Sequence, residues 1–165
     1  MRKIIFVCTG NTCRSPMAES ILKDKIKKIL PNFEEKYQIK SAGIFVDPTN
    51  VDISKKSKDV LKKLYNIDAI HTAKQLTKED IIDADLVLCM DDYQLNVIKN
   101  TIEKSKNIYN LRKYVGLKGD IPDPYGQEEE KYFDSVKLIE EALTLLIKKE
   151  GINWLLLART MVGIN

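Results

Sequence analysis

Two spacings of apolar residues alternate along the chain and predict its secondary structure. The apolar run within residues 3–8 is typical of a strand that is covered on both faces, and residues 84–90, apolar except for Asp85, predict a second strand. Shorter runs predict two more strands at 37–42 and 107–111. Between the strands, apolar residues recur every three or four positions, as they do on an amphipathic helix. This spacing, together with capping residues, predicts helices at 15–30, from 54, from 77, at 92–102 and at 129–149.

The alternation of strands and helices predicts the fold class. We expect one α/β domain over residues 1–150, with a parallel sheet, right-handed crossovers and helices on both faces. An apolar tail at 151–165 follows, and we expect it to pack against the domain and hide Trp154. We expect a monomer. If the tail were exposed instead, its apolar side chains would form a surface through which two chains could pair.

The composition is that of an ordinary globular protein and excludes several function classes. Of the 165 residues, 44% are apolar and 31% are charged, which excludes a disordered chain. A formal net charge of +3 is too small to indicate nucleic-acid binding. No apolar run reaches the about 18 residues of a membrane span, and the pattern of a signal peptide is missing. With only three cysteines, we expect a cytoplasmic protein with free thiols.

The stretch that joins the first strand to the first helix is typical of a phosphate-binding loop. Cys8 ends the strand, and Ser15 followed by Pro16 predicts a helix start, with the serine as its cap. The loop would then aim its backbone N–H groups and the positive end of the helix at one point. The residues that we expect around a bound phosphate are Thr9, Gly10, Asn11, Thr12, Cys13, Arg14 and Ser15.

Cys8, Arg14 and Asp123 supply the groups that phosphoryl transfer through a thiolate requires. The loop N–H groups, the helix terminus and Arg14 predict a Cys8 that is largely ionised at neutral pH. Arg14, at the rim, offers a planar fork for two phosphate oxygens. Asp123 lies in the loop sequence Asp-Pro-Tyr-Gly and is the candidate general acid for the leaving group. This chemistry needs no metal and no cofactor, and the sequence has no metal-ligand spacing.

Residues 7–19, together with Asp-Pro-Tyr at 123–125, resemble the low-molecular-weight protein tyrosine phosphatase family. Three further matches are Ser-Ala-Gly at 41–43, His-Thr-Ala-Lys-Gln-Leu-Thr at 71–77 and Leu-Cys-Met-Asp at 88–91. The resemblance covers residues 3–149. It implies a four-stranded parallel sheet in a flavodoxin-like three-layer sandwich.

The resemblance also implies roles for individual residues. It makes Cys8 the nucleophile of a two-step mechanism through a phosphocysteine, with Arg14 as phosphate clamp and Asp123 as general acid. It further implies a hydrogen-bond network that braces the loop, made by Asn11, Ser15, Ser41 and His71. Asn11 suits this role because asparagine tolerates left-handed backbone.

Two positions depart from the commonest pattern of the tyrosine phosphatases. Thr12 stands where an aliphatic residue is usual, and Gly126 where a second aromatic residue often follows Tyr125. The threonine is similar to the protein-arginine phosphatase branch of the family. A hydroxyl suits the polar guanidinium of phosphoarginine, whereas a branched aliphatic side chain suits a phenyl ring. We therefore expect phosphorylated proteins as partners and phosphoarginine as the preferred substrate, with phosphotyrosine as the alternative and Tyr125 as a wall of the cleft.

Three other reactive side chains have separate interpretations. Cys13 lies in the loop, so a reversible disulfide with Cys8 under oxidant is one hypothesis and a plain loop thiol the other. Cys89 lies in a predicted strand and is expected to be a buried, inert thiol. His71, the single histidine, is expected to be structural rather than a general base.

Three rival functions use similar loops. An arsenate reductase needs two further cysteines to relay a disulfide, but only Cys89 lies downstream of the loop. A phosphocarrier must keep its phosphocysteine, which Arg14 and Asp123 would help to hydrolyse. An inactive phosphate-binding module would not need the complete set of Cys8, Arg14 and Asp123. The set therefore favours a phosphatase over all three.

Overall fold

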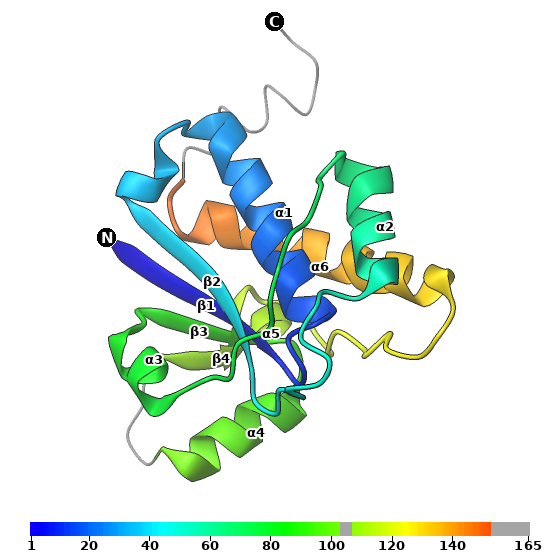
Figure 1. Cartoon of the computed structure of the whole chain (residues 1–165). Helices are drawn as coiled ribbons and strands as arrows, with labels where there is room; N and C mark the ends of the chain where they lie inside the picture. The colour runs from blue at the N-terminus through cyan, green and yellow to red at the C-terminus, as the bar shows by residue number, and fades with distance from the viewer. Residues whose placement is uncertain (103–106, 153–165) are drawn as a thin grey trace, which may run out of the picture.

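A four-stranded parallel sheet forms the centre of the molecule, seen here in a computed structural model that describes residues 1–102 and 107–152 (Figure 1). The strand order is β2-β1-β3-β4. The strands are β1 (Arg2–Cys8), β2 (Tyr37–Gly43), β3 (Leu86–Cys89) and β4 (Ile108–Asn110). All three strand pairs are parallel. The predicted α/β fold with four parallel strands is confirmed, and the carboxyl ends of the strands meet at one edge of the sheet.

Helices cover both faces of the sheet and bury two separate apolar clusters (Figure 1). On one face lie α1 (Arg14–Ile29), α2 (Lys55–Tyr65) and α6 (Glu129–Lys149). On the other face lie α3 (Lys78–Asp83) and α4 (Asp92–Thr101). The two faces divide β1 by alternation, since Ile4 and Phe6 belong to the first cluster and Ile5 and Val7 to the second. This burial on both faces explains the unbroken apolar run of the strand.

Side-chain caps start three of the helices at polar residues of the loops. The Ser54 hydroxyl accepts the N–H of Ser57 at the start of α2. Thr77 forms a capping box with Asp80 at the start of α3, as its sequence predicts. Asp91 forms a second capping box with Gln94 at the start of α4. These caps fix where each crossover re-enters regular structure, and the last one places a carboxylate at the edge of the sheet.

The start of α1 differs from the prediction. The helix begins at Arg14 with Cys13 as its N-cap residue, and no side chain caps it. Ser15 is therefore not the cap, because its hydroxyl turns instead toward Cys8 and Asn11. Pro16 still lies in the first turn, where a missing N–H costs no intrahelical hydrogen bond.

Two short helical segments were not expected from the sequence. A 3-10 turn covers Phe33–Glu35, and α5 covers Leu111–Tyr114. Each is too short to produce a periodic apolar pattern. By contrast, the bounds predicted for α6 are confirmed.

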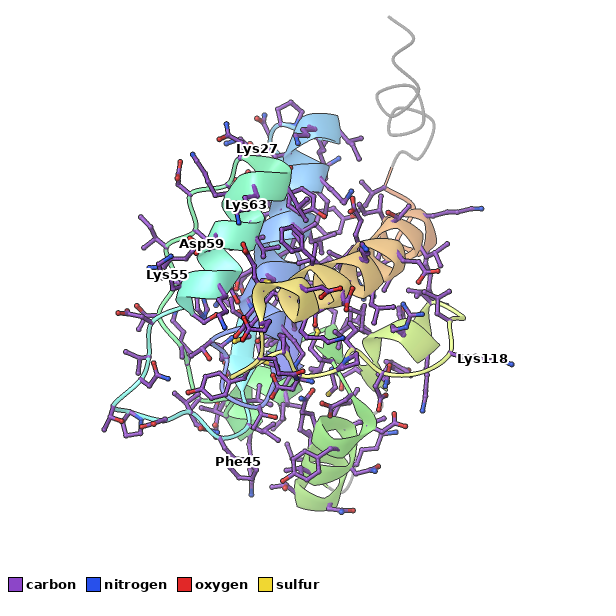
Figure 2. All side chains as sticks on the ribbon, turned by 90° about the vertical axis from the view of Figure 1, so that its right-hand side faces the viewer. Lys27, Phe45, Lys55, Asp59, Lys63 and Lys118 are labelled. Carbon is purple, nitrogen blue, oxygen red and sulfur yellow. The ribbon has the colours of Figure 1, made fainter. Side chains whose placement is uncertain are left out.

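Lysine side chains lie on the exposed faces of the helices, and a few of them form ion pairs with residues of other helices. Figure 2 shows Lys55, Asp59 and Lys63 along α2. Lys55 pairs with Asp59 within the helix at 2.7 Å. Lys63 pairs with Glu129 of α6 and thereby joins the two helices at the end of the loop that carries Asp123.

Two residues of the tail belong to the described structure. Gly151 and Ile152 are described, and Ile152 is buried against the first apolar cluster. Trp154 and the leucines that follow it lie outside the described residues. Among the helices that are described, none combines the length and apolarity that crossing a bilayer requires.

Candidate active site

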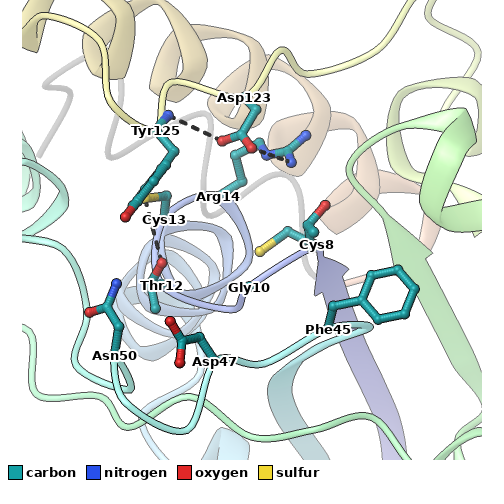
Figure 3. Close-up of a pocket in the computed structure, with 11 residues that line it drawn as sticks. Cys8, Gly10, Thr12, Cys13, Arg14, Phe45, Asp47, Asn50, Asp123 and Tyr125 are labelled. Carbon is teal, nitrogen blue, oxygen red and sulfur yellow. Dashed lines mark hydrogen bonds and ion pairs between the residues drawn. The ribbon is translucent and has the colours of Figure 1, made fainter.

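A cavity of about 260 Å³ opens at the carboxyl edge of the sheet, directly above Cys8 (Figure 3). The loop between β1 and α1 forms its floor, with Cys8, Gly10 and Thr12 among the lining residues. Asp123 and Tyr125 line it from the loop before α6. The remaining wall comes from the crossover after β2 and consists of Phe45, Asp47 and Asn50. The structure thus brings the three proposed catalytic residues of the sequence, Cys8, Arg14 and Asp123, into one cavity.

Cys8 sits at the bottom of this cavity and receives hydrogen bonds on its sulfur. The N–H of Asn11 donates to Cys8 Sγ at 3.2 Å, and Ser15 Oγ lies 2.9 Å from the same sulfur. Burial raises the pKa of the Cys8 thiol, whereas the Ser15 hydroxyl, the Arg14 charge and backbone N–H groups lower it. Burial is the largest of these effects, so the net shift of the Cys8 pKa runs against the prediction of a largely ionised thiol. Burial outweighs the opposing groups, and two carboxylates already engage the guanidinium of Arg14.

A chain of hydrogen bonds leads from Glu19 to the Ser15 hydroxyl beside Cys8. The Ser41 hydroxyl donates to Glu19 Oε2 at 2.6 Å, so its oxygen accepts from Asn11 Nδ2 at 3.0 Å. The second amide proton of Asn11 goes to Ser15 Oγ at 2.8 Å. Because Ser15 accepts this bond, its own proton is free to point at Cys8 Sγ. Ser15 can therefore donate to the sulfur once Cys8 is ionised, which stabilises the thiolate.

Asn11 is the centre of the network and is completely buried. Its backbone is left-handed, with φ of 56°, which asparagine adopts more readily than most residues. The N–H of Lys74 donates to Asn11 Oδ1 at 2.9 Å, which fixes the orientation of the amide. His71 Nε2 lies 3.0 Å from both Asn11 Oδ1 and the Asn11 carbonyl, so this nitrogen carries a proton and donates. Burial lowers the pKa of His71, which keeps its ring neutral.

The structure therefore joins the four residues that the family resemblance implies as a brace. These residues are Asn11, Ser15, Ser41 and His71, and Glu19 extends the network beyond them. The sequence reasoning did not include Glu19. Its position five residues after Arg14, on the helix that follows the loop, was the available signal.

Backbone hydrogen bonds hold the loop to its neighbours. Ile44 N–H donates to the Cys8 carbonyl at 3.1 Å, and Ser54 N–H to the Thr12 carbonyl at 2.8 Å. Gly43 makes the first of these contacts possible, because a Cβ at this position would lie 2.8 Å from the Thr9 carbonyl oxygen. The crossover after β2 thus packs directly on the loop and supports its shape.

Arg14 lies inside the site and not at its rim, with 2% of its surface exposed. Its Nη1 donates to Asp91 Oδ2 at 2.6 Å and to the Ile121 carbonyl at 3.0 Å. Its Nη2 lies 3.3 Å from Asp123 Oδ2. Its buried Nε has no hydrogen-bond partner among the residues that the structure describes. The edge formed by Nε and Nη2 is the one that can bind two oxygens of one phosphate.

Asp123 reaches the site from the loop before α6, and half of its side chain is exposed. Its Oδ1 accepts the N–H of Tyr125 at 3.2 Å, and Gln127 Nε2 donates to its carbonyl at 2.7 Å. Gly126 has a φ of 74°, so the loop needs glycine there and not a second aromatic residue. Tyr125 is exposed and lines the cavity beside Asp123 (Figure 3).

Neither of the other cysteines belongs to a disulfide. Cys13 Sγ lies 3.4 Å from Ser54 Oγ and 3.7 Å from the Tyr132 hydroxyl. Cys89 is completely buried in β3, and burial raises the pKa of its thiol. Cys89 is thus the buried thiol that the sequence predicts.

Several residues of the site were missing from the sequence reasoning. Phe45, Asp47 and Asn50 line the cavity, but nothing local indicates where a crossover loop will run. Gln94 is completely buried and donates to Asp91 Oδ2 at 2.8 Å and to Thr9 Oγ1 at 3.3 Å. Its spacing from Asp91 is that of a capping box, a signal that could have identified it.

Comparison with known proteins finds one family throughout. The model of the low molecular weight phosphotyrosine protein phosphatase family matches residues 3–153. The low molecular weight protein-tyrosine-phosphatase PtpB of Staphylococcus aureus is 35% identical over 150 residues, 91% of this chain and 98% of the relative. A protein-arginine-phosphatase of Geobacillus stearothermophilus is 38% identical over 149 residues, 89% and 95% of the two chains. The crystal structure of a YwlE mutant from Bacillus subtilis superposes with a TM-score of 0.82 at 33% identity, covering 92% and 99%.

Proposed function

The chain belongs to the low molecular weight phosphotyrosine protein phosphatase family, and from this membership we propose that it dephosphorylates protein side chains with Cys8 as nucleophile, Arg14 as phosphate clamp and Asp123 as general acid. One observation carries the assignment of roles. Cys8 Sγ, a buried guanidinium edge with a free Nε–H, and the Asp123 carboxylate converge on one cavity. This is the set of groups that a phosphocysteine mechanism requires.

In the first step, the Cys8 sulfur attacks phosphorus. The thiol loses its proton to solvent beforehand, and Ser15 stabilises the resulting anion. The phosphate dianion occupies the Nε and Nη2 edge of Arg14, which displaces Asp123 from its 3.3 Å contact. Asp123, released from Arg14, first takes up a proton from solvent. The S–P bond then forms, the bond from phosphorus to the leaving group breaks, and Asp123 gives this proton to the departing atom.

In the second step, water cleaves the phosphocysteine. Asp123, now a carboxylate, takes a proton from water while the water oxygen attacks phosphorus. The S–P bond breaks, and inorganic phosphate and the Cys8 thiolate are released. Throughout, the loop N–H groups stabilise the equatorial oxygens of the transferring phosphoryl group.

We propose phosphoarginine as the preferred substrate because of Thr12. This residue lines the cavity beside the loop floor, and the 8% of it that is exposed faces the space where a substrate would lie. A hydroxyl can exchange hydrogen bonds with a guanidinium, whereas an apolar ring leaves it without a partner. The arginine phosphatase of Geobacillus supports the proposal at the level of the family.

Phosphotyrosine is the second candidate, and two exposed aromatic side chains favour it. Phe45 is 58% and Tyr125 is 61% exposed, and both line the mouth of the cavity. Such walls suit the faces of a phenol ring. The phosphatase PtpB of Staphylococcus aureus carries tyrosine in its name.

The deciding experiment compares turnover of phosphoarginine and phosphotyrosine by wild type and Thr12→Ile. We expect wild type to prefer phosphoarginine and Thr12→Ile to reverse the preference, by about tenfold or more in the ratio of kcat/KM. Thr101→Ile, at the exposed end of α4 and not among the lining residues, is the control. A wild type that cleaves phosphotyrosine far better than phosphoarginine would overturn the substrate assignment.

Two further proposals concern the state of the protein in the cell. We propose that it is a monomer, because the site is complete within one chain, and that it is cytoplasmic, because its three cysteines are free thiols. Sedimentation velocity of the full chain and of a chain ending at residue 152 tests the monomer. A dimer that disappears on truncation would contradict it.

A further inference from the structure

Asp47 is a carboxylate on the wall of the catalytic cavity that forms no ion pair with any residue in the described part of the chain. It lies in the crossover after β2, and the proposed mechanism does not use it. Its neighbour in the cavity wall is Asn50, whose N–H closes a turn by donating to the Asp47 carbonyl at 3.0 Å.

One oxygen of Asp47 is occupied, and the other is available. Oδ1 accepts the N–H of Thr49 at 2.8 Å and its hydroxyl at 2.7 Å. These two bonds fix the orientation of the carboxylate, and they lower the pKa of Asp47, so it is ionised at neutral pH. Oδ2 makes no hydrogen bond to the residues of 1–102 or 107–152. The cavity is therefore lined by a fixed negative charge with a free acceptor.

The charges of the cavity are separated by depth. The floor holds donors, namely the loop N–H groups and the Arg14 guanidinium. The mouth holds two carboxylates, Asp47 and Asp123, which lie on opposite sides of the loop in Figure 3. A ligand that matches this order has a dianionic group at its deep end and a cationic group next to it.

We propose that Asp47 determines specificity by accepting a hydrogen bond from an unphosphorylated nitrogen of the phosphoarginine guanidinium. Phosphoarginine has the required order of charges, because its phosphoryl group is bonded directly to a guanidinium. Phosphotyrosine presents an apolar ring at the same depth and gains nothing from a carboxylate. The inference rests on the proposed function and deepens it, since Asp47 acts on the same group that Thr12 contacts.

Kinetics with three substrates test the role of Asp47. Asp47→Asn keeps Oδ1 for the Thr49 bonds and removes the charge. We expect this variant to lower kcat/KM for free phosphoarginine about fivefold, mainly by raising KM. The effect is modest because the charge of Asp47 is exposed and screened by salt. Turnover of phosphotyrosine and of p-nitrophenyl phosphate should stay unchanged. Asp52→Asn is the matched control, because it removes the same charge from the same loop at a position that does not line the cavity.

Salt supplies a second readout. Raising the ionic strength should erode the preference of wild type for phosphoarginine, while the preference of Asp47→Asn should stay constant. An unchanged substrate ratio in Asp47→Asn, or an equal loss in Asp52→Asn, would overturn the inference. So would a loss that occurs with basic phosphopeptides but not with free phosphoarginine, because Asp47 would then bind a flanking residue.

The two proposals fail in different ways. If wild type prefers phosphotyrosine, the substrate assignment falls, and the inference falls with it. If wild type prefers phosphoarginine and Asp47→Asn leaves that preference intact, only the role of Asp47 falls.

Discussion

Replacing Asn11 by alanine should lower the free energy of unfolding, and the size of the loss measures how much the loop network contributes to stability. The side chain of Asn11 makes four hydrogen bonds, to Ser15, Ser41, His71 and the N–H of Lys74. Each buried bond contributes about 1 kcal/mol to stability. Alanine also loses the tolerance of asparagine for left-handed backbone, at φ of 56°, which costs about 1 kcal/mol more. The expected loss is therefore about 4 to 5 kcal/mol, or roughly 10 to 15 °C in Tm for a domain of this size.

Asn66 provides a matched control for the backbone term. It has a φ of 55°, is exposed, and ends α2. Asn66→Ala should thus lose about 1 kcal/mol, the left-handed preference alone. Urea unfolding of both variants measures the difference. If Asn11→Ala costs no more than Asn66→Ala, the network contributes nothing to stability and the reasoning is refuted.

Three other predictions follow from the site. Asp123→Asn should cut turnover of p-nitrophenyl phosphate at least about a hundredfold, because it cannot protonate the leaving group, yet still bind vanadate; lost vanadate binding in titrations would contradict this. Peroxide should inactivate wild type in a way that a thiol reductant reverses through a Cys8–Cys13 disulfide, and Cys13→Ser should be inactivated irreversibly; mass spectrometry that finds Cys8 sulfonic acid in wild type would count against the pairing. Because burial lowers the pKa of His71 below 6.5, folding excludes its proton, so the free energy of unfolding should fall as the pH drops below that value. His71→Gln should show a shallower fall between pH 7.5 and 5.5, and an equal fall would contradict the assignment.

The parts of the fold that repeat a pattern could be predicted from the sequence. The long helix α6 has an apolar stripe over its whole length, so both of its ends were predicted. β3 was predicted at 84–90, three residues longer than the observed Leu86–Cys89, because the apolar residues Ala84 and Met90 lie just outside the paired ones. The four residues of α5 give no periodic signal and were not predicted.

The chemistry of the site divides in the same way. Cys8, Arg14 and Asp123 were identifiable because each lies in a short motif whose residue types have a chemical purpose. The burial of Arg14 and the wall made by Phe45 and Asp47 depend on the path of separate loops. The spacing of residues along the chain does not show which separate loops meet, so these features can be seen only in the folded structure.

The bracing of the loop has a consequence for turnover. Since Asn11 and the contacts of Ile44 and Ser54 hold the loop through bonds within the chain, little conformational entropy should be lost when a phosphate binds. The released product presents the same oxygens to the same donors as the substrate did. We therefore expect inorganic phosphate to be a competitive product inhibitor, so that turnover falls as the surrounding phosphate concentration rises.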